Sequence, residues 1–163
     1  MLNDSGRGKG RCDLLPLDIL CKYLWLFESM NSDNVDYQIV EHILGDLYTF
    51  LDTRDVEYLY KIIAASRDDI FGMDIYSVFL EVSFSFEEDA DKWGVDGWKK
   101  QIGEWEYIDS AIKHLLKWAR DDEDERHDRA FIWNIICLIW YVENYSLNKK
   151  EQVKDEKTKT INE

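Results

Sequence analysis

The chain contains very little proline and cysteine, and both shortages limit the fold. There is one proline in 163 residues. Proline breaks helix interiors, so its scarcity leaves few helices interrupted. The three cysteines, Cys12, Cys21 and Cys137, are too few and too irregularly spaced for a disulfide framework or a zinc site. The sequence therefore predicts a helical protein in a reducing compartment, held together by its apolar core.

Positive charge is also scarce. Twenty Lys and Arg face thirty-four Asp and Glu, which gives a net charge of −14. Duplex nucleic acid and anionic membranes are bound through Lys and Arg, so this balance argues against both as partners. An acidic protein can still bind a nucleotide when divalent cations lie between its carboxylates and the phosphates. The same balance fits a protein that is acidic for solubility, or one that mimics nucleic acid and blocks a basic partner.

No apolar stretch is long enough to span a membrane. The most apolar run, residues 130–142, has twelve apolar residues among thirteen, whereas a membrane-spanning helix needs about 20. Residues 1–13 are polar and glycine-rich, so the chain does not open on a secretory signal. We expect a cytoplasmic protein, in the host cytoplasm if a phage encodes it, with no membrane partner.

The spacing of apolar residues predicts an all-α fold, a single-domain bundle of about six helices. We expect one domain over residues 1–147, with a Gly/basic arm at 1–13, a loop at 93–103 and a disordered, charged tail at 148–163. The predicted helices cover residues 14–27, 35–51, 56–65, 74–92 and 105–120, and a last helix begins near residue 124.

The last helix carries one polar residue inside its apolar run. Asn134 lies three and seven residues from Phe131 and His127, so all three share a helix face. The segment just before it, residues 121–128, is acidic. A buried amide needs hydrogen-bond partners, and we interpret Asn134 as a residue that reads a base or anchors His127.

A second acidic pattern lies on the helix predicted at 74–92. Glu81, Ser85 and Glu88 form one stripe at spacings of four and three. Carboxylates at such spacings can converge on a divalent cation. The alternative is a solvated acidic face, which we prefer for Glu87 and Asp89 and leave open for Glu81 and Glu88.

Four segments together resemble a known family. They are GKGRCDLLP (residues 8–16), EEDADKWGVDGW (87–98), DSAIKHLLKW (109–118) and DEDERHDRAFIWN (122–134). They resemble, in the same order, the phage-associated dATP/dGTP diphosphohydrolase N-terminal domain family, which is similar in style to the MazG-like all-α nucleotide pyrophosphatases. Residues 18–73 match less clearly, as a helical elaboration. Gly97 stands where the family usually has Asn, and Gln101 where it usually has Gly.

The resemblance implies a nucleotide-binding protein that uses Mg²⁺ or Mn²⁺. The metal would be held by some of Glu81, Glu88, Glu125 and Asp128. His114, His127 and Glu125 would be the catalytic residues. The nucleotide would be bound by Arg7, Lys9, Arg11, Lys92, Trp93, Trp98, Lys113 and Asn134. Because folds of this kind usually bring sites together at subunit contacts, we also expect a homo-oligomer.

Three functional hypotheses remain open. The first is a (d)NTP diphosphohydrolase that releases (d)NMP and pyrophosphate. The second is a non-catalytic phage or prophage protein that sequesters a nucleotide or a nucleotide-derived defence signal, for which the altered residues Gly97 and Gln101 are the motive. The third is the acidic mimic, which rests on the net charge alone. Whether the protein is an enzyme is therefore left undecided by the sequence.

Overall fold

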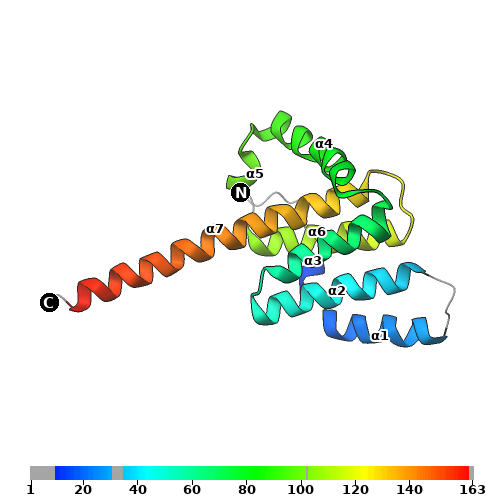
Figure 1. Ribbon diagram of the computed structural model, residues 1–163, viewed down its shortest axis with the longest axis horizontal. Helices are drawn as coiled ribbons and strands as arrows, with labels where there is room; N and C mark the ends of the chain where they lie inside the picture. Colours follow the sequence, from blue (N-terminus) through cyan, green and yellow to red (C-terminus); the bar gives the residue numbers. More distant parts are fainter. Residues whose placement is uncertain (1–9, 31–34, 102, 162–163) are drawn as a thin grey trace.

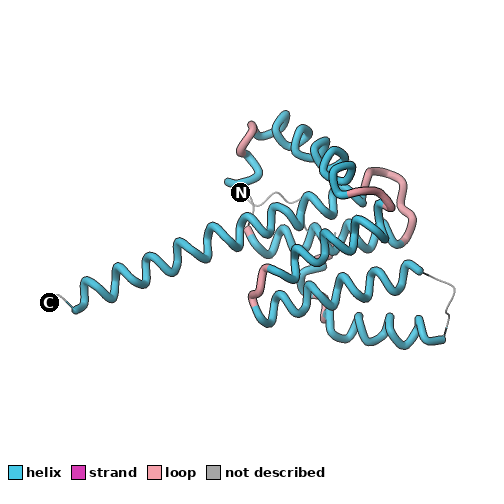
Figure 2. The backbone as a smooth tube through the Cα atoms, viewed as in Figure 1, coloured by secondary structure: helices cyan, strands magenta, loops and turns pink. Residues whose placement is uncertain are grey.

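The computed structural model describes residues 10–30, 35–101 and 103–161. These residues form seven α-helices, a short 3-10 turn at Cys12–Leu14 and a π-helical segment at Arg67–Phe71, and they contain no strand (Figures 1 and 2). The helices are α1 (Leu17–Met30), α2 (Val35–Thr53), α3 (Glu57–Ser66), α4 (Ile75–Trp93), α5 (Gly97–Gln101), α6 (Glu104–Ala119) and α7 (His127–Ile161). The predicted all-α fold is confirmed.

The six expected helices correspond to α1, α2, α3, α4, α6 and α7, and α5 is an additional short helix. It lies inside the stretch predicted as a loop at residues 93–103. Gly94 ends α4 with a φ of 85°, and the chain then re-enters a helix at Gly97. Three glycines in eleven residues suggested a loop. Gly94 and Gly103 lie near the two ends of this stretch, and Gly97 lies in close contact with Trp93.

The core is built around the first half of α7. Phe131, Ile132, Ile135 and Leu138 are almost completely buried, as expected for a helix that is apolar on most sides. Figure 1 shows α6 running alongside this half, with α4 on one side and α1 and α2 on the other. Among the helices described, none combines the length and apolar character needed to cross a bilayer.

Helix α6 is strongly amphipathic and so fixes which of its residues face the core. Its buried side chains are Tyr107, Ile108, Ala111, Ile112 and Leu115. These positions follow the three- and four-residue spacing of one helix face. His114 lies at the border of this face and is directed towards the start of α7.

Helix α7 continues through Ile161 and extends away from the bundle (Figure 1). The composition of residues 148–163 predicts a disordered tail, and this stays a prediction beside the helical backbone described as far as Ile161. Lys, Glu and Gln are good helix formers, and the buried half of α7 supplies the nucleus that an isolated charged segment lacks.

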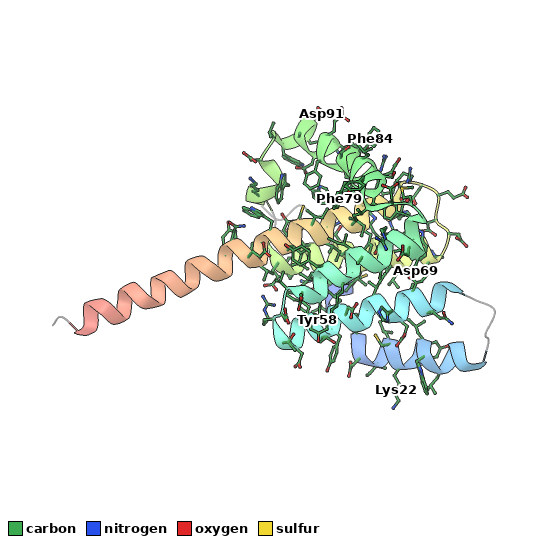
Figure 3. The ribbon with its side chains drawn as sticks, viewed as in Figure 1. Lys22, Tyr58, Asp69, Phe79, Phe84 and Asp91 are labelled. Atoms are coloured by element: carbon green, nitrogen blue, oxygen red, sulfur yellow. The ribbon has the colours of Figure 1, made fainter. Side chains whose placement is uncertain are left out.

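Helix α4 stands apart from the main bundle and contacts it chiefly through α7. Asp74 caps its first turn by accepting a hydrogen bond from the Ser77 N–H at 3.0 Å. Figure 3 shows Phe79 and Phe84 on this helix, and both are about half exposed, at 50% and 49%. This separated helix forms one wall of the site described next.

Candidate functional site

Two histidines from neighbouring helices meet at one end of the bundle. His114 Nδ1 on α6 lies 3.0 Å from His127 Nδ1, at the first residue of α7. His127 is buried, at 2% exposure, and His114 is half-buried. Glu125 approaches the pair from the connection between the helices, and its Oε1 lies 3.5 Å from each Nδ1. A tight turn makes this possible, since Asp121 adopts a left-handed conformation with φ of 63°.

Asp124 fixes the orientation of the buried histidine. Its Oδ1 lies 2.7 Å from His127 Nε2, and this hydrogen bond lowers the pKa of the Asp124 carboxyl. A carboxylate only accepts hydrogen bonds, so Nε2 carries the proton and Nδ1 of a neutral ring presents its lone pair. Burial lowers the pKa of His114, and it outweighs the opposing effect of Glu125.

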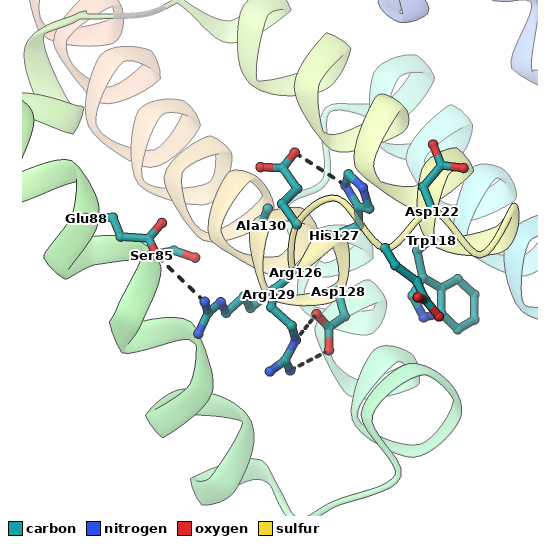
Figure 4. Close-up of a pocket in the computed structure, with 11 residues that line it drawn as sticks. Ser85, Glu88, Trp118, Asp122, Arg126, His127, Asp128, Arg129 and Ala130 are labelled. Atoms are coloured by element: carbon teal, nitrogen blue, oxygen red, sulfur yellow. Dashed lines mark hydrogen bonds and ion pairs between the residues drawn. The ribbon is translucent and has the colours of Figure 1, made fainter.

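A groove of about 540 Å³ opens beside His127, between α4 and the start of α7. Arg129 reaches into it from the first turn of α7, and Arg126 from the residue just before that helix (Figure 4). Arg126 forms two hydrogen bonds to Asp128, at 2.8 and 3.0 Å, and lies 3.3 Å from Glu81. Arg129 lies 3.6 Å from Glu88 and 4.0 Å from Glu81. The groove thus places two guanidinium groups next to the histidine pair.

The predicted four-carboxylate metal set does not form one site. Glu81, Glu88 and Asp128 each face Arg126 or Arg129, so arginines occupy the position expected for the cation. Two groups in the described part of the chain have ligand atoms close enough to share a metal ion. They are His114, Glu125 and His127, and Asp122, Asp124 and His127. Of the predicted ligands, only Glu125 belongs to either.

The basic N-terminal arm lies only partly within the described residues. Arg7 and Lys9 fall outside them. Arg11 forms two hydrogen bonds to Asp13, at 2.7 and 2.6 Å, and stacks over the Trp105 ring at 3.7 Å. This arrangement fixes the arm against the first turn of α6, so Arg11 is engaged with protein groups.

Lys113 is engaged in the same way. Its Nζ lies 2.8 Å from Asp109 Oδ2, and Asp109 Oδ1 also accepts a hydrogen bond from the Cys12 N–H at 2.6 Å. Lys113 is one residue from His114 in sequence, but it takes part in the packing of the N-terminal segment on α6. Neither Lys113 nor Arg11 lines the groove beside His127.

The residues predicted to stack on a base are divided between core and surface. Trp98 packs edge-to-face on Phe86 and Trp140, with ring centroids 5.6 and 5.1 Å from its own, so it packs α5 against the core. Trp93 is 58% exposed, and Lys92 beside it is also exposed. None of the three lines the groove.

Asn134 is buried but does not contact the histidines through any hydrogen bond described. Its Nδ2 donates to the Ala130 carbonyl at 2.8 Å, within its own helix. Its Oδ1 is buried and has no hydrogen-bond partner among the described residues. The shared helix face with His127 is real, but the amide lies one turn further into the core than the groove.

The sequence interpretation missed Arg126, Arg129 and Asp124. A signal was present, because the two arginines stand three apart at the end of the acidic segment, as Glu81 and Glu88 stand seven apart on α4. Opposite charges at helical spacing on two helices can face each other. Nothing in the sequence, however, fixed which faces of α4 and α7 would meet.

Residues 70–152 match the family described as dATP/dGTP diphosphohydrolase, N-terminal. This span covers 83 of 163 residues and runs from the π-helical segment before α4 into the second half of α7. It includes the histidine pair, Glu125 and both arginines, while α1, α2 and α3 lie outside it. No curated protein and no solved structure gives a significant match. The chain belongs to the dATP/dGTP diphosphohydrolase N-terminal domain family.

Proposed function

We propose that the groove binds the phosphates of a nucleoside triphosphate and that the protein cleaves it to (d)NMP and pyrophosphate. The observation that carries this proposal is the position of Arg126 and Arg129 in a groove next to the His114–His127 pair. Guanidinium groups bind phosphate oxygens in pairs and stay charged at every relevant pH. The groove and the pair both lie within the segment that matches the nucleotide-hydrolase family.

Without nucleotide, the two guanidinium groups form ion pairs with carboxylates of the protein. Glu81 contacts both arginines, and Glu88 and Asp128 contact one each. A triphosphate would exchange places with these carboxylates, which would leave several negative charges close together. We therefore propose that the nucleotide enters with Mg²⁺ or Mn²⁺ on its phosphates, as is usual for phosphoryl chemistry.

The groups suited to promoting hydrolysis lie at the histidine end of the groove. His127 and Glu125 line it, and His114 lies directly behind them. Imidazoles and a carboxylate are the groups that most often orient and deprotonate an attacking water. In this proposal the arginines hold the phosphates while these three residues activate the water.

The direct test is incubation with a panel of dNTPs and NTPs in the presence of Mg²⁺ or Mn²⁺. We expect pyrophosphate release from at least one nucleotide. Arg129→Ala should weaken nucleotide binding about 10- to 100-fold, since hydrogen bonds to charged groups contribute roughly 1.5–3 kcal/mol. Arg67→Ala is the matched control, because Arg67 pairs with its neighbour Asp68 away from the groove. Absence of binding by every nucleotide would refute the proposal.

Glu81→Gln separates arginine binding of phosphate from metal binding by carboxylates. If the arginines bind phosphate, removing this competing charge should tighten nucleotide binding about two- to five-fold, the range of an exposed ion pair. If Glu81 instead holds the metal, the same change should weaken binding and raise the metal concentration required. Isothermal titration with a non-hydrolysable triphosphate analogue at two Mg²⁺ concentrations distinguishes the two results.

A second function is favoured by the pairing of Asp128 with Arg126. Asp128 lies three residues after Glu125, so the two form an E-x-x-D pattern, yet the Asp128 carboxylate faces a guanidinium instead of an open cation position. A protein with this arrangement could sequester a nucleotide without cleaving it. Stoichiometric nucleotide binding without pyrophosphate release, unchanged by a chelator, would support this non-catalytic alternative.

A further inference from the structure

Three donor atoms from three consecutive segments converge on one point at the end of the groove. They are His114 Nδ1 from α6, Glu125 Oε1 from the connection and His127 Nδ1 from α7. Imidazole nitrogen is a preferred ligand of Zn²⁺ and its neighbours in the first transition row, whereas Mg²⁺ prefers oxygen. We propose that these three residues bind one divalent transition-metal ion, of the class of Zn²⁺, directly to the protein.

The spacing of the donors fits such an ion. The three atoms form a triangle with sides of 3.0, 3.5 and 3.5 Å. Around a tetrahedral ion with bonds of about 2.0–2.1 Å, neighbouring donors lie roughly 3.3–3.4 Å apart. The rings and the carboxylate therefore need to move by only a few tenths of an ångström, about the tolerance expected of a true site.

Asp124 supplies the supporting contact that metal-bound histidines usually have. A ligating imidazole almost always donates its other N–H to a carboxylate or carbonyl, which fixes the ring and its tautomer. His127 Nε2 makes this contact with Asp124 Oδ1 at 2.7 Å. The lone pair of His127 Nδ1 is thereby directed at His114 and Glu125, and the buried ring has no freedom to turn away.

The second candidate group, Asp122, Asp124 and His127, is less suited to the ion. Asp122 is already engaged by Arg120 through two hydrogen bonds. His127 could serve this group only through Nε2, which carries the proton shared with Asp124. The group with His114 has no competing arginine at the described distances, so it is the one that the geometry favours.

The ion would also have an open side. Glu125 and His127 both line the groove, and the Glu125 side chain is 53% exposed. Three protein ligands with a free fourth position are typical of zinc sites that bind water or a substrate oxygen, whereas structural sites are closed by four ligands. The site is thus placed to meet whatever occupies the groove next to the arginines.

Metal binding can be measured without nucleotide, so its outcome does not depend on the proposed hydrolase function. The full chain is stripped with a chelator and titrated with Co²⁺, whose visible absorption reports tetrahedral nitrogen and oxygen ligands. Zn²⁺ is then added to displace it. We expect one ion per chain, displacement by Zn²⁺, and no displacement by a large excess of Mg²⁺.

Four variants locate the ion. His114→Ala and Glu125→Gln should each weaken Co²⁺ binding at least 10-fold, and Asp124→Asn about 10- to 100-fold, the usual effect of losing the contact that orients a ligand. His42→Ala is the control, since His42 is exposed on α2. Glu125 is also exposed, so Glu125→Gln remains informative if His114→Ala fails to fold by circular dichroism.

Two results would overturn the inference. One is no Co²⁺ or Zn²⁺ uptake by the stripped wild-type chain, in which case the two histidines form only a hydrogen bond. The other is uptake that persists unchanged in Glu125→Gln and Asp124→Asn, because the ion would then be bound elsewhere. Displacement of Co²⁺ by Mg²⁺ would overturn the assignment to a transition metal in the same experiment.

Discussion

Among the described glycines, Gly97 is the one where an added methyl group meets a neighbouring atom too closely. A Cβ built there lies 2.4 Å from the Trp93 Cβ, whereas non-bonded carbon atoms prefer about 3.5–4.0 Å. Both carbons are attached directly to the backbone, so no side-chain rotation relieves the overlap. Gly97→Ala should therefore force α5 away from the end of α4.

The expected loss is about 1–3 kcal/mol in the free energy of unfolding, the range for inserting a methyl group into a well-packed region. For a domain of this size, each kcal/mol lowers Tm by roughly 2–4 °C. The φ of Gly97 is not in the left-handed region, so the effect is a steric one. Urea unfolding followed by circular dichroism measures the free energy.

Gly45→Ala is a control with the same chemistry and the opposite sign. Gly45 lies inside α2, and its Cβ would meet nothing within 4 Å. Alanine is the better helix former, so this change should stabilise the protein by about 0.5–1 kcal/mol. A rise for Gly45→Ala with a fall for Gly97→Ala separates the local overlap from any general effect of added methyl groups.

A double-mutant cycle identifies the partner. In a Trp93→Gly background the opposing Cβ is absent, so Gly97→Ala should cost much less than in the wild type, with a coupling of at least about 1 kcal/mol. A Gly97→Ala protein within about 0.5 kcal/mol of wild type would refute the packing of α5 on α4.

Three further predictions concern the core, the thiols and the N-terminal arm. Asn134→Leu should leave the stability unchanged or raise it, because Oδ1 is buried without a partner; a loss above about 2 kcal/mol in urea unfolding would contradict this. Burial raises the pKa of Cys21 to about 11 and raises that of Cys137 further. Iodoacetamide at pH 8 should therefore label Cys21 slowly and Cys137 only on unfolding. Peptide mass spectrometry measures the labelling of each cysteine. The hydrogen bond from Arg11 lowers the pKa of Asp13, so this pair stabilises the fold above about pH 4 and the gain is lost progressively as the pH falls further. The stability difference between wild type and Asp13→Asn should therefore shrink as the pH is lowered below about 4.

The helices were predictable because their apolar spacing is a local property. The run at 130–142 contains one polar residue in thirteen, and only a buried helix accommodates it. The extent of α7 was not predictable in the same way. Its charged half has no apolar face, so composition favours disorder, whereas the helix that precedes it favours continuation.

The site was predictable in its residue types and not in its geometry. His114, His127 and Glu125 were singled out through the family resemblance, and the structure brings these three together. The carboxylates on α4 were assigned to a cation because Glu81 and Glu88 share a helix face. Which cation faces them depends on the packing angle of α4 against α7, which the sequence of neither helix determines. In the structure, the cations that face Glu81 and Glu88 are arginine side chains.

The separation of the two histidines has a consequence for how the protein folds. His114 and His127 are only 13 residues apart and belong to a helical hairpin, so their meeting requires the closure of one short loop. Helix α4, by contrast, reaches α7 across α5 and α6. Local contacts form earlier and more readily than distant ones, so the imidazole pair should assemble with the α6–α7 hairpin. The groove would be completed later, when α4 docks and brings Glu81 and Glu88 to the arginines.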